Sequence, residues 1–142
     1  MSVIFSRRCE YALQAVLYLA LKPEGERTSI KELTQQIKMP SPFLAKILQD
    51  LAHKKLLESF KGPHGGFALG KPAKDITLFD IVEAMDGGGL TKNCVLGFEE
   101  CSATDPCSMH DDWKKIREGI SSMLLRQDIA QMAKQMHKPE YL

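Results

Sequence analysis

Residues 41 to 69, SPFLAKILQDLAHKKLLESFKGPHGGFAL, contain the helix and the hairpin that decide the fold. Ser41 followed by Pro42 is typical of a helix start, with a capping serine and a proline at the first helical position. We therefore expect a helix over about 42 to 54. Its buried face is predicted from apolar residues that recur at spacings of three and four: Leu44, Ile47, Leu48 and Leu51.

A hairpin is predicted directly after this helix. Residues 56 to 61 and 67 to 69 have the composition of two short strands, and the segment GPHGG at 62 to 66 is typical of the turn between them. Glycines in that turn permit a positive φ and a close approach to the backbone of a ligand. A hairpin in this position is the wing of a winged helix.

Two further helices are expected before residue 41. The first covers residues 5 to 21 and buries one apolar face: Cys9, Leu13, Val16, Leu17 and Ala20. The second begins after Ser29, which forms a predicted capping box with Glu32. Because only the turn at 38 to 40 separates this helix from the next, the two form a helix-turn-helix, whose second helix can lie in the major groove of DNA.

The charge of the chain is unevenly distributed, although its net value is only +1. Residues 1 to 75 have a net charge of +5 and residues 76 to 142 a net charge of −4. This division favours a polyanion as the partner of the first half. The outward face of the helix predicted over 42 to 54 carries five residues: Ala45, Lys46, Gln49, His53 and Lys54. We expect Lys46 and Gln49, with Lys61 and His64 of the wing, to contact double-stranded DNA.

The second half of the chain contains two more predicted helices. Thr77 and Asp80 indicate a capped helix over 78 to 86. Further along, four apolar residues recur at intervals of three and four, as in a coiled-coil seam: Trp113, Ile116, Ile120 and Met123. A seam of this kind is typical of a homodimer interface, and packing on its own domain is the alternative. Gln127 would interrupt a third heptad.

Residues 94 to 110, CVLGFEECSATDPCSMH, have no helical or strand period and are expected to form a loop. Thiolates favour zinc, copper(I) and iron–sulphur clusters, and imidazole also suits zinc and iron. The candidate donors are three cysteines and a histidine: Cys94, Cys101, Cys107 and His110. The absence of a Cys-x-x-Cys knuckle favours a cluster over zinc, with unligated redox thiols as a third interpretation. Cys9 is expected to be a buried hydrophobe.

The composition excludes several classes of protein. With 44% hydrophobic residues, a chain of 142 residues can bury a core without disulfides. No apolar run is long enough to span a membrane and no signal-peptide pattern is present, so a cytoplasmic protein without a membrane partner is expected. An enzyme is not expected, because the histidines lie in separate elements and no nucleophile–base pair or phosphate loop is visible.

Nearly the whole chain resembles the IscR/NsrR family of winged-helix regulators. The resemblance is carried by CEYALQAVLYLA at 9 to 20, the wing FKGPHGGFALGKP at 60 to 72, DITLFDIVEAMDG at 75 to 87 and the three-cysteine loop. It implies a dimeric DNA-binding transcription factor with a long dimerisation helix and a sensor loop. It also implies base contacts from the start of the recognition helix, here Ser41, and from the wing.

The resemblance also implies a set of cluster ligands. Cys94, Cys101 and Cys107 match the three family cysteines, although the first gap is one residue longer than usual. His110 stands where the IscR branch places a nitrogen ligand. Glu10 stands where the nitric-oxide and redox-sensing branches place a carboxylate from the partner subunit. The fourth ligand is thus either His110 or Glu10, and the cluster contains two or four irons.

The predicted fold is mainly α with a small β hairpin. A winged helix-turn-helix DNA-binding domain is expected over 1–76, and residues 77–142 are expected to contain a helix, a cysteine sensor loop (87–110) and a dimerisation helix (111–136). The predicted function is a homodimeric transcription regulator whose operator affinity is modulated by the cluster, through redox state, iron–sulphur status or nitric oxide. One alternative is a cluster-free or zinc-binding regulator controlled by a protein or small molecule. The other is an iron–sulphur electron-transfer protein.

Overall fold

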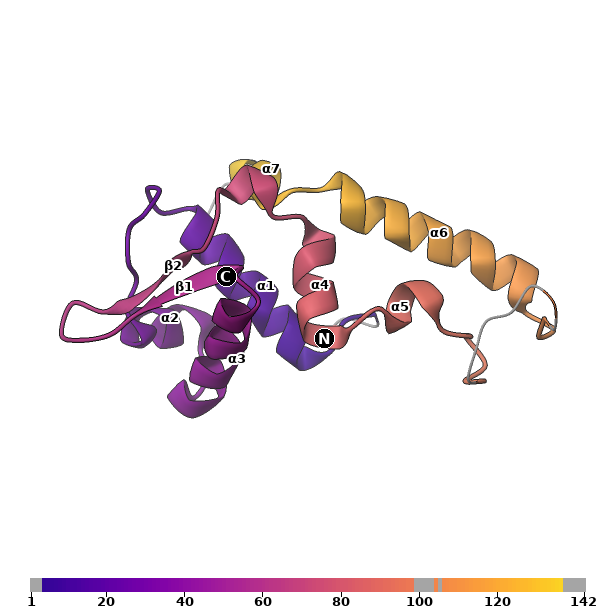
Figure 1. The fold of residues 1–142 in the computed structure, drawn as a ribbon, viewed down its shortest axis with the longest axis horizontal. Coiled ribbons are helices and arrows are strands. Elements are labelled where there is room, and N and C mark those ends of the chain that lie inside the picture. Colours follow the sequence, from indigo (N-terminus) through magenta and orange to yellow (C-terminus); the bar gives the residue numbers. More distant parts are fainter. Residues whose placement is uncertain (1–3, 99–103, 105, 137–142) are drawn as a thin grey trace.

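The computed structural model describes residues 4–98, 104 and 106–136. Its elements in chain order are α1 (Arg7–Ala20), α2 (Ile30–Ile37), α3 (Ser41–His53), β1 (Leu57–Phe60), β2 (Gly66–Leu69), the short 3-10 helix η1 (Ala73–Asp75), α4 (Leu78–Asp86), α5 (Gly89–Lys92), α6 (His110–Arg126) and α7 (Ile129–Gln135). Figure 1 shows α1 to α4, α7 and the hairpin gathered in one body, from which α5 and α6 extend as an arm. The hairpin and this arm point to opposite ends of the molecule.

The hairpin is antiparallel, with Leu57 opposite Leu69 and Phe60 opposite Gly66. Thr28, just before α2, also pairs with Phe67 of β2 through two backbone hydrogen bonds of 2.9 and 2.8 Å. The wing is therefore attached through β2 to the residue that precedes the capping residue of α2. The predicted mainly α fold with a winged helix-turn-helix and a small hairpin is confirmed.

The core is organised around α1, which contacts α2, α3, α4 and α7. The larger side chains that are fully buried come from almost every element of the body: Leu33, Leu44, Leu48, Leu51, Ile76, Ile81, Leu124 and Ile129. The predicted inner face of α3 is buried as expected. Because Leu124 and Ile129 share this core, it extends across the boundary predicted at residues 76 and 77. The division of the chain into two functional parts remains a prediction.

The helix predicted as one element over 111 to 136 is wrong in its extent, because α6 ends at Arg126 and α7 starts at Ile129. Gln127 is extended, and the Asp128 side chain accepts a hydrogen bond from the Gln131 amide in a complete capping box. The backbone amide of Leu78 also donates to the Gln127 carbonyl at 3.0 Å. A new cap and this pairing with the start of α4 end the long helix and direct α7 back onto α1.

One of the two predicted capping boxes differs from the structure. Ser29 accepts a hydrogen bond from the Glu32 amide, but the Glu32 carboxylate binds α1 instead: it accepts from the Tyr18 hydroxyl at 2.5 Å and pairs with Lys22 Nζ at 2.7 Å. Only half of that capping box is present. The box of Thr77 and Asp80 before α4 is complete, as predicted.

Ser41 is the first residue of α3 and not its cap. The Leu44 amide donates to the Pro40 carbonyl at 3.2 Å, so the first helical hydrogen bond begins one residue earlier than expected. The Ser41 hydroxyl lies 3.1 Å from Thr34 Oγ1 and so joins the two helices of the helix-turn-helix. The prediction of Ser41 as the capping residue was wrong, because the helix already begins after Pro40.

Candidate functional site

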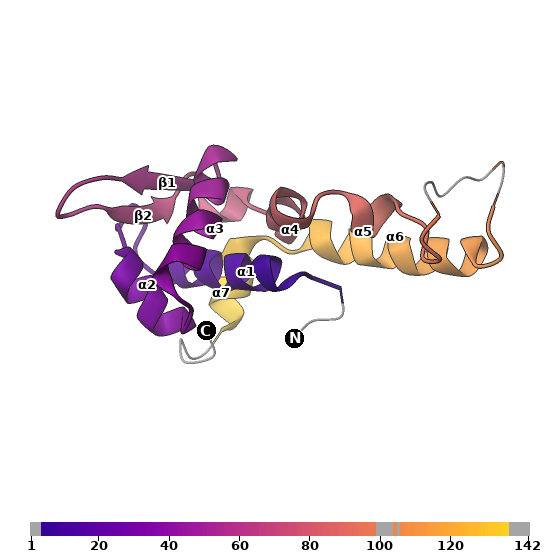
Figure 2. The ribbon, with the colours of Figure 1, turned by 90° about the horizontal axis from the view of Figure 1, so that it is seen from below.

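The predicted DNA-contacting residues all lie on the exposed surface of the winged helix. Three are on α3 and two are at the wing tip: Ser41, Lys46, Gln49, Lys61 and His64. The Lys46 side chain is 77% exposed, and its Nζ lies 3.5 Å from an Asp50 carboxylate oxygen one turn along the helix. Figure 2 shows the hairpin extending beyond the helix-turn-helix, as a wing that flanks DNA would. The arrangement offers a helix and a flanking loop to the duplex.

Arg27 stabilises the wing in a way that no local pattern predicts. Its guanidinium lies over the ring of Phe60 in β1, 3.7 Å from the ring centroid. Phe60 precedes the wing tip, and Arg27 precedes the residue that pairs with β2. This cation–π contact places a positive charge beside the end of β1, next to the wing tip.

An ion pair between α1 and α3 is the second feature that the sequence did not reveal. Arg8 pairs with Asp50 on the recognition helix, and its other guanidinium nitrogen donates to the Met85 carbonyl of α4 at 3.4 Å. Asp50 also pairs with Lys46. Since Arg8 and Asp50 are 42 residues apart, no spacing in the sequence could have indicated the contact.

Ser6 provides a second link between α1 and α4. Its backbone amide donates to Asp86 at 2.9 Å and its hydroxyl donates to the same carboxylate. The hydroxyl also accepts from the Cys9 amide at 3.0 Å and caps α1. The first turn of α1 is thereby fixed to the last turn of α4, immediately before the chain enters the arm.

The cysteine segment is held on the arm by α6. The short helix α5 was not predicted, because the three glycines at 87 to 89 were expected to lead directly into the loop. The Trp113 indole donates to the Asn93 carbonyl at 2.8 Å, and Arg117 donates to the Lys92 carbonyl at 3.2 Å. Both contacts hold the residues before Cys94 against α6.

Cys94 and Cys107 are brought together at this point. Their sulphur atoms are 3.4 Å apart, and Cys94 is buried. A hydrogen bond from the Leu96 backbone lowers the pKa of Cys94 from its usual value, with further lowering by Cys107 and by the backbone of Phe98 and Gly97, against the opposing effect of burial. A lowered pKa increases the thiolate fraction of Cys94 relative to an ordinary cysteine, and the thiolate is the form in which cysteine binds metals.

The other proposed ligands have different positions. His110 is buried as the first residue of α6, and its backbone amide donates to the Cys107 carbonyl at 3.1 Å. Cys101 lies outside the described residues. Glu10 is half-buried in the first turn of α1, and Figures 1 and 2 both place α1 in the body, away from the cysteine segment at the outer end of α6. Within the described part of the chain, no group of three or more His, Cys, Asp or Glu side chains forms a metal site.

The donor chemistry at Cys94 and Cys107 suits an iron–sulphur cluster. Two adjacent sulphurs supply soft ligands, and backbone donors near one of them compensate thiolate charge, as such ligands require. Cys9 has a different environment. It is fully buried, and burial raises its pKa to about 12, with smaller contributions from Asp86 and Glu10. Its predicted role as a buried hydrophobe is confirmed.

The apolar seam of α6 faces two environments. Trp113, Ile120 and Met123 are half-buried, and the last two pack against the core of the body. Ile116 is 57% exposed. The seam therefore contributes to packing within the chain, and its role as a dimer interface remains a prediction. None of the helices in the described segments has the length and apolarity that a membrane span needs.

A helix-turn-helix joined to a two-stranded wing, with basic side chains on both, defines a winged-helix DNA-binding protein. The chain belongs to the Rrf2 family, described as iron-dependent transcriptional regulators, whose model matches residues 5–135. It is accordingly a DNA-binding transcription regulator, as predicted from the wing and the cysteine loop. Membership of a regulator family also agrees with the expectation that the protein is not an enzyme.

Individual relatives give the same assignment. An HTH-type transcriptional regulator of Aquifex aeolicus is 37% identical over 120 residues, which are 83% of each chain. Among solved structures, the global cysteine regulator CymR of B. subtilis has a TM-score of 0.78 at 24% identity and covers 95% of this chain and 99% of its own. IscR of T. potens has a TM-score of 0.73 at 23% identity, with 97% and 93% covered. The two structures show that the fold is shared.

Proposed function

We propose that the protein is a homodimeric transcription regulator whose operator affinity depends on an iron–sulphur cluster held by its cysteine loop. The ligands would be Cys94, Cys101 and Cys107, with either His110 or Glu10 of the partner subunit. The observation that carries the proposal is the 3.4 Å approach of the Cys94 and Cys107 sulphurs beside backbone donors. When bound, such a cluster supplies one-electron redox chemistry and reactivity toward nitric oxide.

The residues around the loop provide a route from this site to the recognition helix. Gly87 follows the last residue of α4 with a φ of +74°, a backbone conformation that residues other than glycine rarely adopt. The last turn of α4 holds the start of α1 through Asp86 and the Met85 carbonyl. Arg8 then holds Asp50 on α3. A change in the position of the loop can therefore reach α3 through residues in direct contact.

The exposed side of α6 supports the proposal of a homodimer. Ile116 is exposed there, and a Cβ added at Gly119, one turn further on, would have no neighbouring atom within 4 Å beyond the backbone of its own helix. A second helix can approach such a surface closely. A Glu10 ligand would have to come from a second subunit, because α1 of the same chain lies away from its own loop (Figure 1). Dimerisation would also present two recognition helices to two half-sites of an operator.

Anaerobic purification followed by visible spectroscopy and by iron, sulphide and zinc analysis tests this proposal. We expect a coloured protein containing iron and sulphide, and Cys94→Ala should lose the colour. A colourless protein that contains zinc would contradict the cluster. His110→Ala and Glu10→Gln, made separately, identify the fourth ligand by which one alters the spectrum. Glu24→Gln, in the exposed loop after α1, is the matched carboxylate control.

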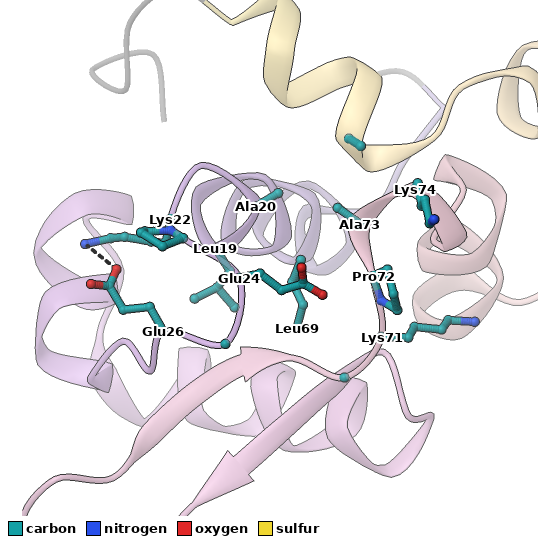
Figure 3. A pocket seen from close by; sticks show the side chains of 14 residues that line it. Leu19, Ala20, Lys22, Glu24, Glu26, Leu69, Lys71, Pro72, Ala73 and Lys74 are labelled. Atoms are coloured by element: carbon teal, nitrogen blue, oxygen red, sulfur yellow. Dashed lines mark ion pairs between the residues drawn. The ribbon is translucent and has the colours of Figure 1, made fainter.

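A pocket on the body favours the alternative of a cluster-free regulator controlled by a small molecule. It has a volume of about 690 Å³ and lies between the end of α1, the end of β2, η1 and α7. Figure 3 shows Leu19 and Leu69 in its lining, with Lys71 and Lys74 toward one end. Lys22 at the other end is paired with Glu26 and Glu32. If cluster-free protein changes its DNA affinity when a small anion is added, and Lys71→Gln removes the response, the alternative is supported. The regulator family favours either form over an electron-transfer protein.

A further inference from the structure

The recognition helix carries an aromatic ring that the core does not use. Phe43, the third residue of α3, is 66% exposed, the largest fraction among the exposed large hydrophobic residues of the described chain. The next residue, Leu44, is fully buried. The inward face of α3 is thus complete without Phe43, and the ring points outward from the first turn of the helix.

The neighbours of Phe43 offer few hydrogen-bond donors to a base edge. Pro40 and Pro42 are exposed and have no N–H group. The Ser41 hydroxyl lies within hydrogen-bond distance of Thr34 on α2. Lys46, three residues after Phe43, lies on the same side of the helix. The first turn of α3 therefore presents an apolar ring beside one cation.

This surface is separate from the exposed apolar residues that follow Cys94. Val95, Leu96 and Phe98 are also exposed, but they follow Cys94 at the outer end of the arm. Figure 1 places α3 in the body, beside the hairpin and away from that end. A contact between subunits at the cysteine loop would therefore leave Phe43 exposed.

We propose that Phe43 is a specificity-determining residue that selects thymine at one position of each operator half-site. Residues at the start of a recognition helix contact base edges in the major groove. The C5-methyl of thymine is the apolar group displayed there, and cytosine lacks it. Lys46 positions the helix on a phosphate, and the Phe43 ring covers the methyl group. The inference depends on the DNA-binding function of the family and not on the cluster.

The test uses the full-length protein in one fixed cluster state. Bound duplexes are first selected from a random pool, and each thymine of the selected site is then replaced singly by uracil, which differs only by the missing methyl. At the position read by Phe43, uracil should weaken binding of the wild type by about fourfold, because the burial of one methyl group is lost. Cytosine at that position should bind weakly, and 5-methylcytosine should regain part of the affinity.

Substitution assigns this sensitivity to the ring. Phe43→Ala should bind the thymine and uracil duplexes equally, and Phe43→Leu should keep part of the difference. Leu21→Ala, at the end of α1, is the control for loss of an exposed apolar side chain and should behave as the wild type, since Leu21 is 37% exposed and lies outside α3. The inference is overturned if no thymine is sensitive to its methyl group, or if Phe43→Ala keeps the sensitivity. Failure of every protein to bind DNA would contradict the regulator function as well.

Discussion

Replacement of Gly66 by alanine is expected to detach the wing from the helix-turn-helix. Gly66 begins β2 with a φ of +143°, and a Cβ there would lie 2.3 Å from the Thr28 carbonyl oxygen. Thr28 is the residue that pairs with Phe67 through two backbone hydrogen bonds. The added methyl cannot be accommodated by rotating a side chain, because the atom that it meets belongs to the backbone.

The size of the effect follows from these contacts. A non-glycine residue in a strained backbone conformation costs about 1–3 kcal/mol. Loss of the two hydrogen bonds to Thr28 costs about 0.5–1.5 kcal/mol each. We therefore expect Gly66→Ala to reduce the free energy of unfolding by about 3 kcal/mol. Gly62, at the wing tip, also has a positive φ of +95° but nothing within 4 Å of its added Cβ, so Gly62→Ala should cost only about 1 kcal/mol.

Urea unfolding of the wild type and both variants measures the difference, with the free energy extrapolated linearly to water. Gly66→Ala should unfold at clearly lower urea than Gly62→Ala. Its DNA affinity should also fall, because the wing is no longer held beside α3. Equal stability of the two variants would show that the contact with Thr28 does not stabilise the protein, since the variants differ mainly in that contact.

Three further substitutions test the DNA surface, the link between α1 and α3, and an ion pair. Lys46→Gln should reduce the slope of log affinity against log salt by about one, because one phosphate contact is lost. An unchanged slope would show that Lys46 does not contact a phosphate. Arg8→Gln should reduce the difference in DNA affinity between cluster-bound and cluster-free protein, as measured by fluorescence anisotropy. A difference as large as that of the wild type would show that Arg8 does not couple the cysteine loop to α3. The pKa of Glu32 is lowered by Lys22 and then by Tyr18. Its stabilising effect is therefore present at neutral pH and lost as the pH falls through that lowered pKa, so the unfolding free energy of Glu32→Gln should decline less between neutral pH and about pH 3 than that of the wild type.

Much of the fold could be predicted because local chemistry determines it. The apolar period of α3, the glycine-rich wing tip and the capping box of Thr77 each act over a few residues. Two of the wrong predictions arose where a distant group competed with a local one. Glu32 binds Lys22 and Tyr18 instead of its own helix, and the helix after residue 110 ends at Arg126 because the start of α4 pairs with Gln127.

The candidate site was also predicted only in part. The spacing of the cysteines predicted a shared site, and Cys94 and Cys107 are adjacent in the structure. The pair of Arg8 and Asp50 depends on how α1 crosses α3, which no sequence pattern states. Phe43 was not among the predicted DNA contacts because an apolar residue in a helix is normally expected to face the core, and only its exposure indicates otherwise.

We propose that the cysteine loop controls DNA binding through a bound cluster. The most direct test measures the operator affinity of one anaerobic preparation before and after removal of the cluster, at the same salt concentration and with a selected duplex. We expect two different dissociation constants, and a Cys94→Ala protein should bind as the cluster-free form does. Identical dissociation constants for the cluster-bound and cluster-free protein would contradict the claim.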